Sequence, residues 1–94
     1  MEEKHEAFFK RLLAELKNDR EWPGEYLFKF IVPTDVGKVA EVEKSFNDMG
    51  AVINTKRSKN ETYTSISINV VMESAEQIVN KYKEVAHIEG IISL

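Results

Sequence analysis

The sequence has no cysteine, and histidine, proline and glycine are scarce. Without cysteine there is no disulfide framework, no thiol chemistry and no thiolate zinc site. His5 and His87 have no third ligand at a metal-binding spacing, so we expect no metal and no cofactor. No serine stands in a G-x-S-x-G context, and glycine is too sparse for a nucleotide cradle. We therefore expect no catalytic residues and no enzyme activity.

Long apolar runs are also absent. No stretch approaches the ~20 apolar residues of a membrane-spanning helix. The start, MEEKHEAFFK, lacks the basic and then apolar segments of a signal peptide, so we expect a cytoplasmic protein with no membrane partner. The net charge of −3 argues against a general polyanion binder, and we expect no nucleic-acid partner.

What the chain does have is a long alternating stretch at residues 62–72. Apolar side chains recur at every second position from Ile66 to Met72, which predicts an extended strand with one buried face. Its length places it at the centre of a sheet. The opposite face of this strand carries Tyr63, Ser65, Ser67, Asn69 and Val71.

Similar patterns predict the other elements. Helices are expected at residues 4–17, from Thr34 or Asp35 to about Met49, and from Ser74 to His87. Gly50 is the expected left-handed stop of the second helix, and Ser74 with Gln77 has the capping-box pattern. The two later helices are expected to bury Val39, Val42, Phe46 and Met49, and Ala75, Ile78, Val79, Tyr82, Val85 and Ala86.

Strands at 26–32, 51–56 and 90–94 complete the order helix, then strand–helix–strand–strand–helix–strand. This order predicts a ferredoxin-like α+β sandwich, a four-stranded antiparallel sheet with two helices on one face, plus an extra N-terminal helix. The first and third strands should be central and the other two should be edges. We expect one domain, 1–94, with residues 1–20 as a helical extension and 25–94 as the βαββαβ core.

The extra helix carries an apolar stripe that needs a partner. We expect Phe8, Leu12 and Leu16 to be mostly buried, on the open sheet face, at its margin or against a second subunit. Trp22 can be a lid on the edge of the core or an exposed contact residue, and packing is favoured. The stripe consists of Phe8, Phe9, Leu12, Leu13 and Leu16.

Four short motifs occur in order along the chain: the turn Trp22-Pro23, the strand Phe28-Lys29-Phe30, the run from Ser58-Lys59 to Tyr63-Thr64-Ser65-Ile66-Ser67-Ile68, and the hydrophobic C-terminus. Together they resemble the YbeD-like family of small bacterial proteins, a domain of unknown function. The resemblance covers about residues 22–94 and implies no established activity.

The segment Val32-Pro33-Thr34-Asp35-Val36-Gly37, with Gly50-Ala51-Val52-Ile53 after the helix, is similar to the start of ACT regulatory domains. This resemblance implies binding of an amino acid or other small effector near that loop, at a dimer interface. Asp35 and Gly37 are then the candidate ligand-binding residues. From the residues alone, Asp35 can also cap the helix, which is the favoured role.

The open sheet face offers Lys29, Tyr63, Ser65 and Ser67 as further candidate contacts. An RNA-binding interpretation, with Tyr63 stacking on a base beside the basic loop residues 56–59, is disfavoured by the acidic net charge. The alternative is that Tyr63 packs beneath the N-terminal helix.

We expect a non-catalytic, ACT-like regulatory module that senses a small amino- or carboxylate-bearing effector. The alternative is a protein-interaction adaptor that uses a sheet edge, the open face or the N-terminal helix to bind an unidentified protein. The two edge strands present unpaired backbone groups, so we expect a twofold homodimer.

Overall fold

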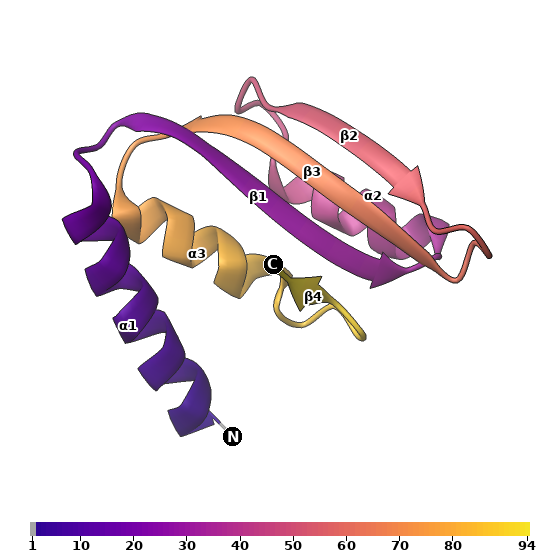
Figure 1. Cartoon of the computed structure of the whole chain (residues 1–94), viewed down its shortest axis with the longest axis horizontal. Coiled ribbons are helices and arrows are strands. Elements are labelled where there is room, and N and C mark those ends of the chain that lie inside the picture. The colour runs from indigo at the N-terminus through magenta and orange to yellow at the C-terminus, as the bar shows by residue number, and fades with distance from the viewer. Residues whose placement is uncertain (1) are drawn as a thin grey trace.

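The computed structural model describes the backbone of residues 2–94 and the side chains of residues 6–94 (Figure 1). Three helices and four strands follow one another along the chain in the order that the sequence predicts. The sheet forms one layer, and the helices lie on one side of it. The elements are α1 (Glu2–Asp19), β1 (Gly24–Pro33), α2 (Val36–Ser45), β2 (Val52–Arg57), β3 (Tyr63–Met72), α3 (Ala75–Val85) and β4 (Ile92–Ser93).

The sheet has the strand order β2-β3-β1-β4, and all its pairs are antiparallel. This confirms the ferredoxin-like α+β fold with an extra N-terminal helix, and it confirms that the first and third strands are central. The β1–β3 pairing runs over the full length of both strands, from Gly24 opposite Met72 to Pro33 opposite Tyr63. The β4 strand is much shorter than predicted and pairs only with Phe30 and Ile31.

Alternation along β1 and β3 sends one set of side chains into the core. Phe28, Phe30 and Val32 are fully buried against the helices, as are Ile66 and Ile68 from the neighbouring strand. The ring of Phe28 lies 4.9 Å from that of Phe46 and 5.2 Å from that of Tyr82, centroid to centroid. The core is therefore an aromatic cluster between the sheet and the two later helices.

Tyr82 is the one buried tyrosine of this cluster. Its hydroxyl lies 2.8 Å from that of Tyr26, so the polar end of each ring has a partner. Burial, reinforced by this hydrogen bond, raises the pKa of Tyr82 well above its usual value. The tyrosine is therefore a neutral core residue.

The N-terminal helix packs at the margin of the fold, against α3, and leaves the open sheet face uncovered (Figure 1). Leu16 is buried, and its carbonyl accepts a hydrogen bond of 3.2 Å from Nε1 of Trp22, which confirms the packed position of that ring. Lys17 forms a 2.9 Å ion pair with Glu76, and this hydrogen bond holds the pKa of the Glu76 carboxyl below its usual value. The exposed pair contributes little stability, so burial of Leu16 and Trp22 is what fixes the end of the helix.

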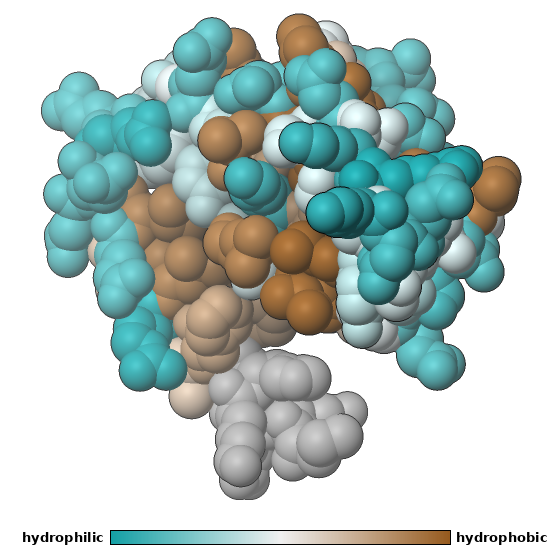
Figure 2. Space-filling model, turned by 45° about the vertical axis from the view of Figure 1, so that its right-hand side comes forward, coloured by the Kyte–Doolittle hydropathy of each residue, from teal (hydrophilic) through white to brown (hydrophobic). Residues whose placement is uncertain are grey.

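Burial along the helix decreases toward its N-terminus. Leu12 is half-buried, while Phe8 is 48% exposed, so the single chain does not bury Phe8 and its burial by a second subunit stays a prediction. Figure 2 shows apolar side chains gathered on the lower half of one face of the molecule. A hollow of about 210 Å³ beside the exposed part of this helix is lined by Phe8, Phe9, Tyr82, Ala86, Ile91 and Ser93.

Both later helices end earlier than predicted. The second helix ends at Ser45, and the chain then turns through Gly50, whose φ of 69° confirms the expected left-handed conformation. The third helix ends at Val85, so Ala86 is exposed, contrary to prediction. A hydrogen bond of 3.0 Å from the Ile88 amide to the Val85 carbonyl turns the chain and buries Ile88 instead.

If the N-terminal helix is held by its C-terminal end, truncating Leu16 should destabilise the protein far more than truncating an exposed leucine. We expect Leu16→Ala to lower the free energy of unfolding by about 2 kcal/mol, because a cavity forms beside Trp22. Leu94→Ala, at a 64% exposed site after β4, is the matched control, with an expected change within about 0.5 kcal/mol. Urea denaturation of both variants measures the difference, and equal losses would contradict this account.

Candidate functional site

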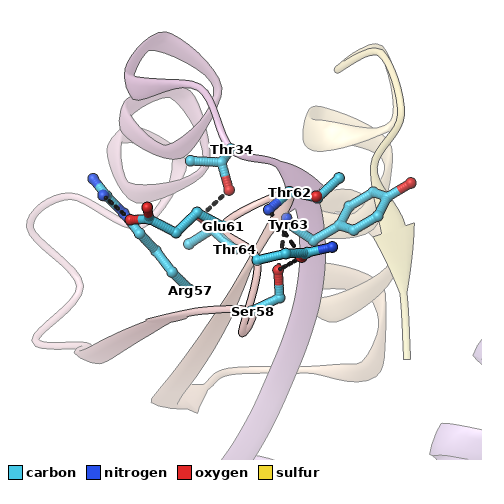
Figure 3. A network of polar contacts seen from close by, with 8 residues as sticks. Thr34, Arg57, Ser58, Glu61, Thr62, Tyr63 and Thr64 are labelled. Atoms are coloured by element: carbon cyan, nitrogen blue, oxygen red, sulfur yellow. Dashed lines mark hydrogen bonds and ion pairs between the residues drawn. The ribbon is translucent and has the colours of Figure 1, made fainter.

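The hairpin between β2 and β3 is held by a compact network of hydrogen bonds (Figure 3). The Ser58 amide donates to the Tyr63 carbonyl at 2.7 Å, and the Tyr63 amide donates to Oγ of Ser58 at 3.0 Å. Oδ1 of Asn60 accepts from the Ser58 hydroxyl at 3.2 Å and from the Thr62 amide at 3.3 Å. These bonds fix the loop backbone and leave the long side chains on either side of it free to reach outward.

The loop between β1 and α2 is joined to this hairpin. The Thr34 amide donates to the Thr62 carbonyl at 2.9 Å, and the hydroxyls of Thr34 and Thr64 lie 3.0 Å apart. Thr64 is the only buried polar side chain among the described residues, at 4% exposure. The polar pair therefore links the predicted effector loop to the hairpin, and the two form one candidate site.

A hollow of about 230 Å³ lies on the helix side of the hairpin. Its lining combines two acids, Asp35 and Glu43, with one base, Arg57, and with the hydroxyl groups of three threonines. The guanidinium forms a 3.0 Å exposed ion pair with Glu61. The residues that line this helix-side hollow are Thr34, Asp35, Val36, Val39, Ala40, Glu43, Thr55, Arg57 and Thr64.

Asp35 also caps the second helix. Its Oδ1 accepts a hydrogen bond of 3.1 Å from the Lys38 amide, as the sequence favours. A Cβ atom at Gly37 would lie only 3.1 Å from that same oxygen, so the glycine leaves room for the cap. Gly37 does not line the helix-side hollow, and its role as a ligand contact stays a prediction.

A second hollow, of about 400 Å³, lies on the open face of the sheet beside the same hairpin. Tyr63 is 46% exposed here, and Figure 3 shows its ring pointing away from the Arg57–Glu61 pair. The expectation that Tyr63 packs beneath the N-terminal helix is therefore wrong, since that helix lies against α3. This open-face hollow is lined by Ile31, Lys56, Arg57, Ser58, Lys59, Tyr63 and Ser65.

The structure thus separates the predicted site residues into groups. Tyr63 and Ser65 share the open-face hollow, and Asp35 lines the helix-side hollow. Lys29 and Ser67 face each other across β1 and β3 on the open face but line neither hollow. Arg57 was not among the predicted site residues, although it lines both hollows. It is the last residue of β2, so extending the predicted strand alternation by one residue would have placed it on a face of the sheet.

No group of three or more histidine, aspartate or glutamate side chains that could hold a metal ion occurs in the part of the chain that the structure describes. His87 lies 2.9 Å from a carboxylate oxygen of Glu41 on the helix layer, and the side chain of His5 lies outside the described residues. None of the described helices is long and apolar enough to cross a bilayer.

Comparison with known proteins places the chain in a family. Residues 17–94 match the family described as "Protein of unknown function (DUF493)", a match that includes both hollows and the Trp22 turn. The chain belongs to this family. It is similar to the UPF0250 proteins of Haemophilus influenzae strains Rd and 86-028NP, with 31% identity over 81 residues, which cover 83% of this chain and 88% of each relative. The resemblance to the YbeD-like family is thereby confirmed, and most of α1 lies outside the match.

The capping role of Asp35 can be separated from other roles by two substitutions. Asp35→Ala should lower the free energy of unfolding by about 1 kcal/mol, because the Lys38 amide loses its acceptor. Asp35→Asn keeps an oxygen at the same place and should retain most of the stability. Denaturant unfolding of the two variants gives the comparison; an Asn variant as unstable as the Ala variant would rule out capping as the main role.

Proposed function

We propose that this protein is a non-catalytic regulatory module that senses a small effector carrying both an amine and a carboxylate. The observation that carries the proposal is the helix-side hollow, in which Asp35 and Arg57 supply opposite charges and three threonines supply hydroxyl groups. A carboxylate on the ligand can accept two parallel hydrogen bonds from a guanidinium, and an amine can donate to an aspartate. The hollow is slightly below the usual size of ligand sites, which suits a free amino acid.

Three charged side chains line the hollow, Asp35, Glu43 and Arg57, and the two that we expect to contact the ligand, Asp35 and Arg57, each have a present partner that still allows ligand binding. The Arg57–Glu61 pair is exposed, with side-chain accessibilities of 62% and 67%, and such a pair contributes only about 0–1 kcal/mol. A ligand carboxylate can therefore replace Glu61 at small cost. Asp35 uses Oδ1 for its helix cap, and the second carboxylate oxygen has lone pairs for an amine.

A thermal-shift screen of amino acids and common carboxylate metabolites tests this site. A ligand that binds only the folded state raises the melting temperature, because its stabilisation of that state grows with the logarithm of the ligand concentration relative to Kd. For any hit, calorimetry should show that Arg57→Gln weakens binding by about tenfold, because a charge-assisted bond is lost. Asp35→Asn should weaken binding of the amine while leaving the helix cap in place.

Arg11→Gln is the matched control, since it removes the same charge at an exposed position of α1. Its affinity should equal that of the unaltered protein. The effector proposal fails if the screen gives no hit, or if the affinity of every hit is unchanged by both site substitutions.

A second candidate function is protein interaction through the open face, and we expect a second copy of the chain as the occupant. Among the described residues, eight large apolar side chains are exposed, and the strand registers place five of them on this face. Glu25 and Lys29 lie on the same face of β1, so a twofold arrangement can bring the acid of one copy to the base of the other. The five are Leu27, Val52, Tyr63, Val71 and Ile92. Tyr63 also lines the open-face hollow, so a dimer that covers its ring and a ligand that stacks on it exclude each other.

A charge placed on this face should prevent the association. We expect the unaltered protein to sediment as a dimer at high micromolar concentration and Val71→Asp to sediment as a monomer, because the new carboxylate is buried in the interface. Val36→Asp is the control, at an 84% exposed valine on a helix, and should remain dimeric. A monomeric unaltered protein, or equal behaviour of the two variants, would rule out the open-face dimer.

A further inference from the structure

The open-face hollow differs in chemistry from the helix-side hollow. Its lining contains three cationic residues, two serines, one tyrosine and one isoleucine, and no carboxylate. The protein as a whole has a net charge of −3, so this end of the sheet carries the opposite sign from the rest of the molecule. A small anion is therefore attracted here although a long polyanion is repelled by the remaining surface.

Two of the cations have no competing partner. Lys56 and Lys59 are exposed, and neither belongs to any ion pair found among the described residues. The guanidinium of Arg57, in contrast, is paired with Glu61. Lys56 and Lys59 are thus the free charges of the open-face hollow. Lys56 lies near the end of β2, and Lys59 lies in the hairpin loop that follows.

Tyr63 supplies a flat surface beside these charges. The β1–β3 register puts it opposite Pro33 on the open face, and its ring remains 46% exposed because α1 packs elsewhere. The hydroxyl of Ser65 donates to the Lys56 carbonyl at 3.3 Å, which ties the strand that carries the tyrosine to the strand that carries the lysine. An exposed aromatic ring next to unpaired lysines is the arrangement that binds a base and its phosphate.

We propose that the open-face hollow binds a nucleotide unit, with its phosphate against Lys56 and Lys59 and its base stacked on Tyr63. A phosphate is favoured over a carboxylate because lysines act as point charges and lack the planar fork that pairs with a carboxylate. The volume of about 400 Å³ is within the range of small-ligand sites. This site is distinct from the proposed effector site, since the two hollows lie on opposite faces of the hairpin and share only Arg57, whereas the proposed nucleotide contacts are Lys56, Lys59 and Tyr63.

NMR titration of the ¹⁵N-labelled full chain tests the proposal. Adenosine monophosphate should shift the amides of residues 56–65 and of Ile31, while inorganic phosphate and adenosine should each bind more weakly. Added salt should weaken the nucleotide but not adenosine, because only the former carries charge. The same titration with an adenylate oligonucleotide distinguishes two sources of the ligand. Much tighter binding of the oligonucleotide than of the mononucleotide indicates that the site binds single-stranded RNA, and similar affinity indicates that it binds a free nucleotide.

Charge-matched variants make the test specific. Lys56→Gln combined with Lys59→Gln should weaken the mononucleotide by about tenfold or more, since two charged contacts are lost. Lys10→Gln combined with Lys44→Gln removes the same charge from exposed positions on two helices and should leave the affinity unchanged. Tyr63→Leu should weaken the mononucleotide by about fivefold or more and leave inorganic phosphate unchanged.

The proposal is overturned if neither the mononucleotide nor the oligonucleotide shifts the hairpin amides, or if the shifts persist in the Lys56 and Lys59 double variant. The dispersion of the spectra shows directly that each variant is folded. Failure here leaves the amino-acid site untouched, because that site is tested through Arg57 and Asp35.

Discussion

The antiparallel pairing of β1 with β3 is the constraint on which the rest of the structure depends. It spans Gly24 to Pro33 and joins the two central strands, so it decides which side chains enter the core. A slip of one residue would turn every side chain to the other face. Phe28 and Phe30 would then face solvent, and Lys29 would enter the aromatic core, at a cost of several kcal/mol for the buried charge. The core therefore locks the register, and the register sets the pattern of the open face.

The same pairing explains why the two hollows are found at one end of the sheet. Pro33 is the last residue of β1 and lies opposite Tyr63, and one further backbone hydrogen bond, from the Thr34 amide to the Thr62 carbonyl, closes the pairing of the two central strands. Beyond this point the chain satisfies its polar groups through the Thr34 hydroxyl, which contacts Thr64, and through the serine and asparagine network of the loop. Arg57 and Tyr63 lie at these strand ends, opposite Thr64 and Pro33. Arg57 and Tyr63 diverge to opposite faces from there, which gives one hairpin two hollows of different chemistry.

Local signals in the sequence were sufficient for the parts of the fold that depend on local physics. Alternation identified the central strand. The residue types at Asp35 and Ser74 predicted the two helix caps, and in the structure each side chain accepts a hydrogen bond from the amide three residues later. The position of α1 was not predictable, because an apolar stripe shows that a helix needs a partner but not which surface provides it. Because α1 packs on α3, Tyr63 stays exposed, and this exposure changes the interpretation of the open face. Arg57 was missed as a site residue because the second strand was predicted to end one residue earlier, at position 56, so the alternation was not extended to it.

The division between a fixed backbone and long exposed side chains also sets the strength of binding expected at this hairpin. Each lysine or arginine that is immobilised by a ligand loses up to about 2 kcal/mol of side-chain entropy. A charge-assisted hydrogen bond returns about 1.5–3 kcal/mol, so each contact of Lys56, Lys59 or Arg57 leaves only a small net gain. Stacking on Tyr63 costs less entropy, because the ring has two rotatable bonds and is already half-buried. For the proposed ligands this balance favours weak binding, so that the occupied fraction of the site changes with the ligand concentration. A sensor of abundant metabolites needs this property, whereas a tightly held cofactor does not.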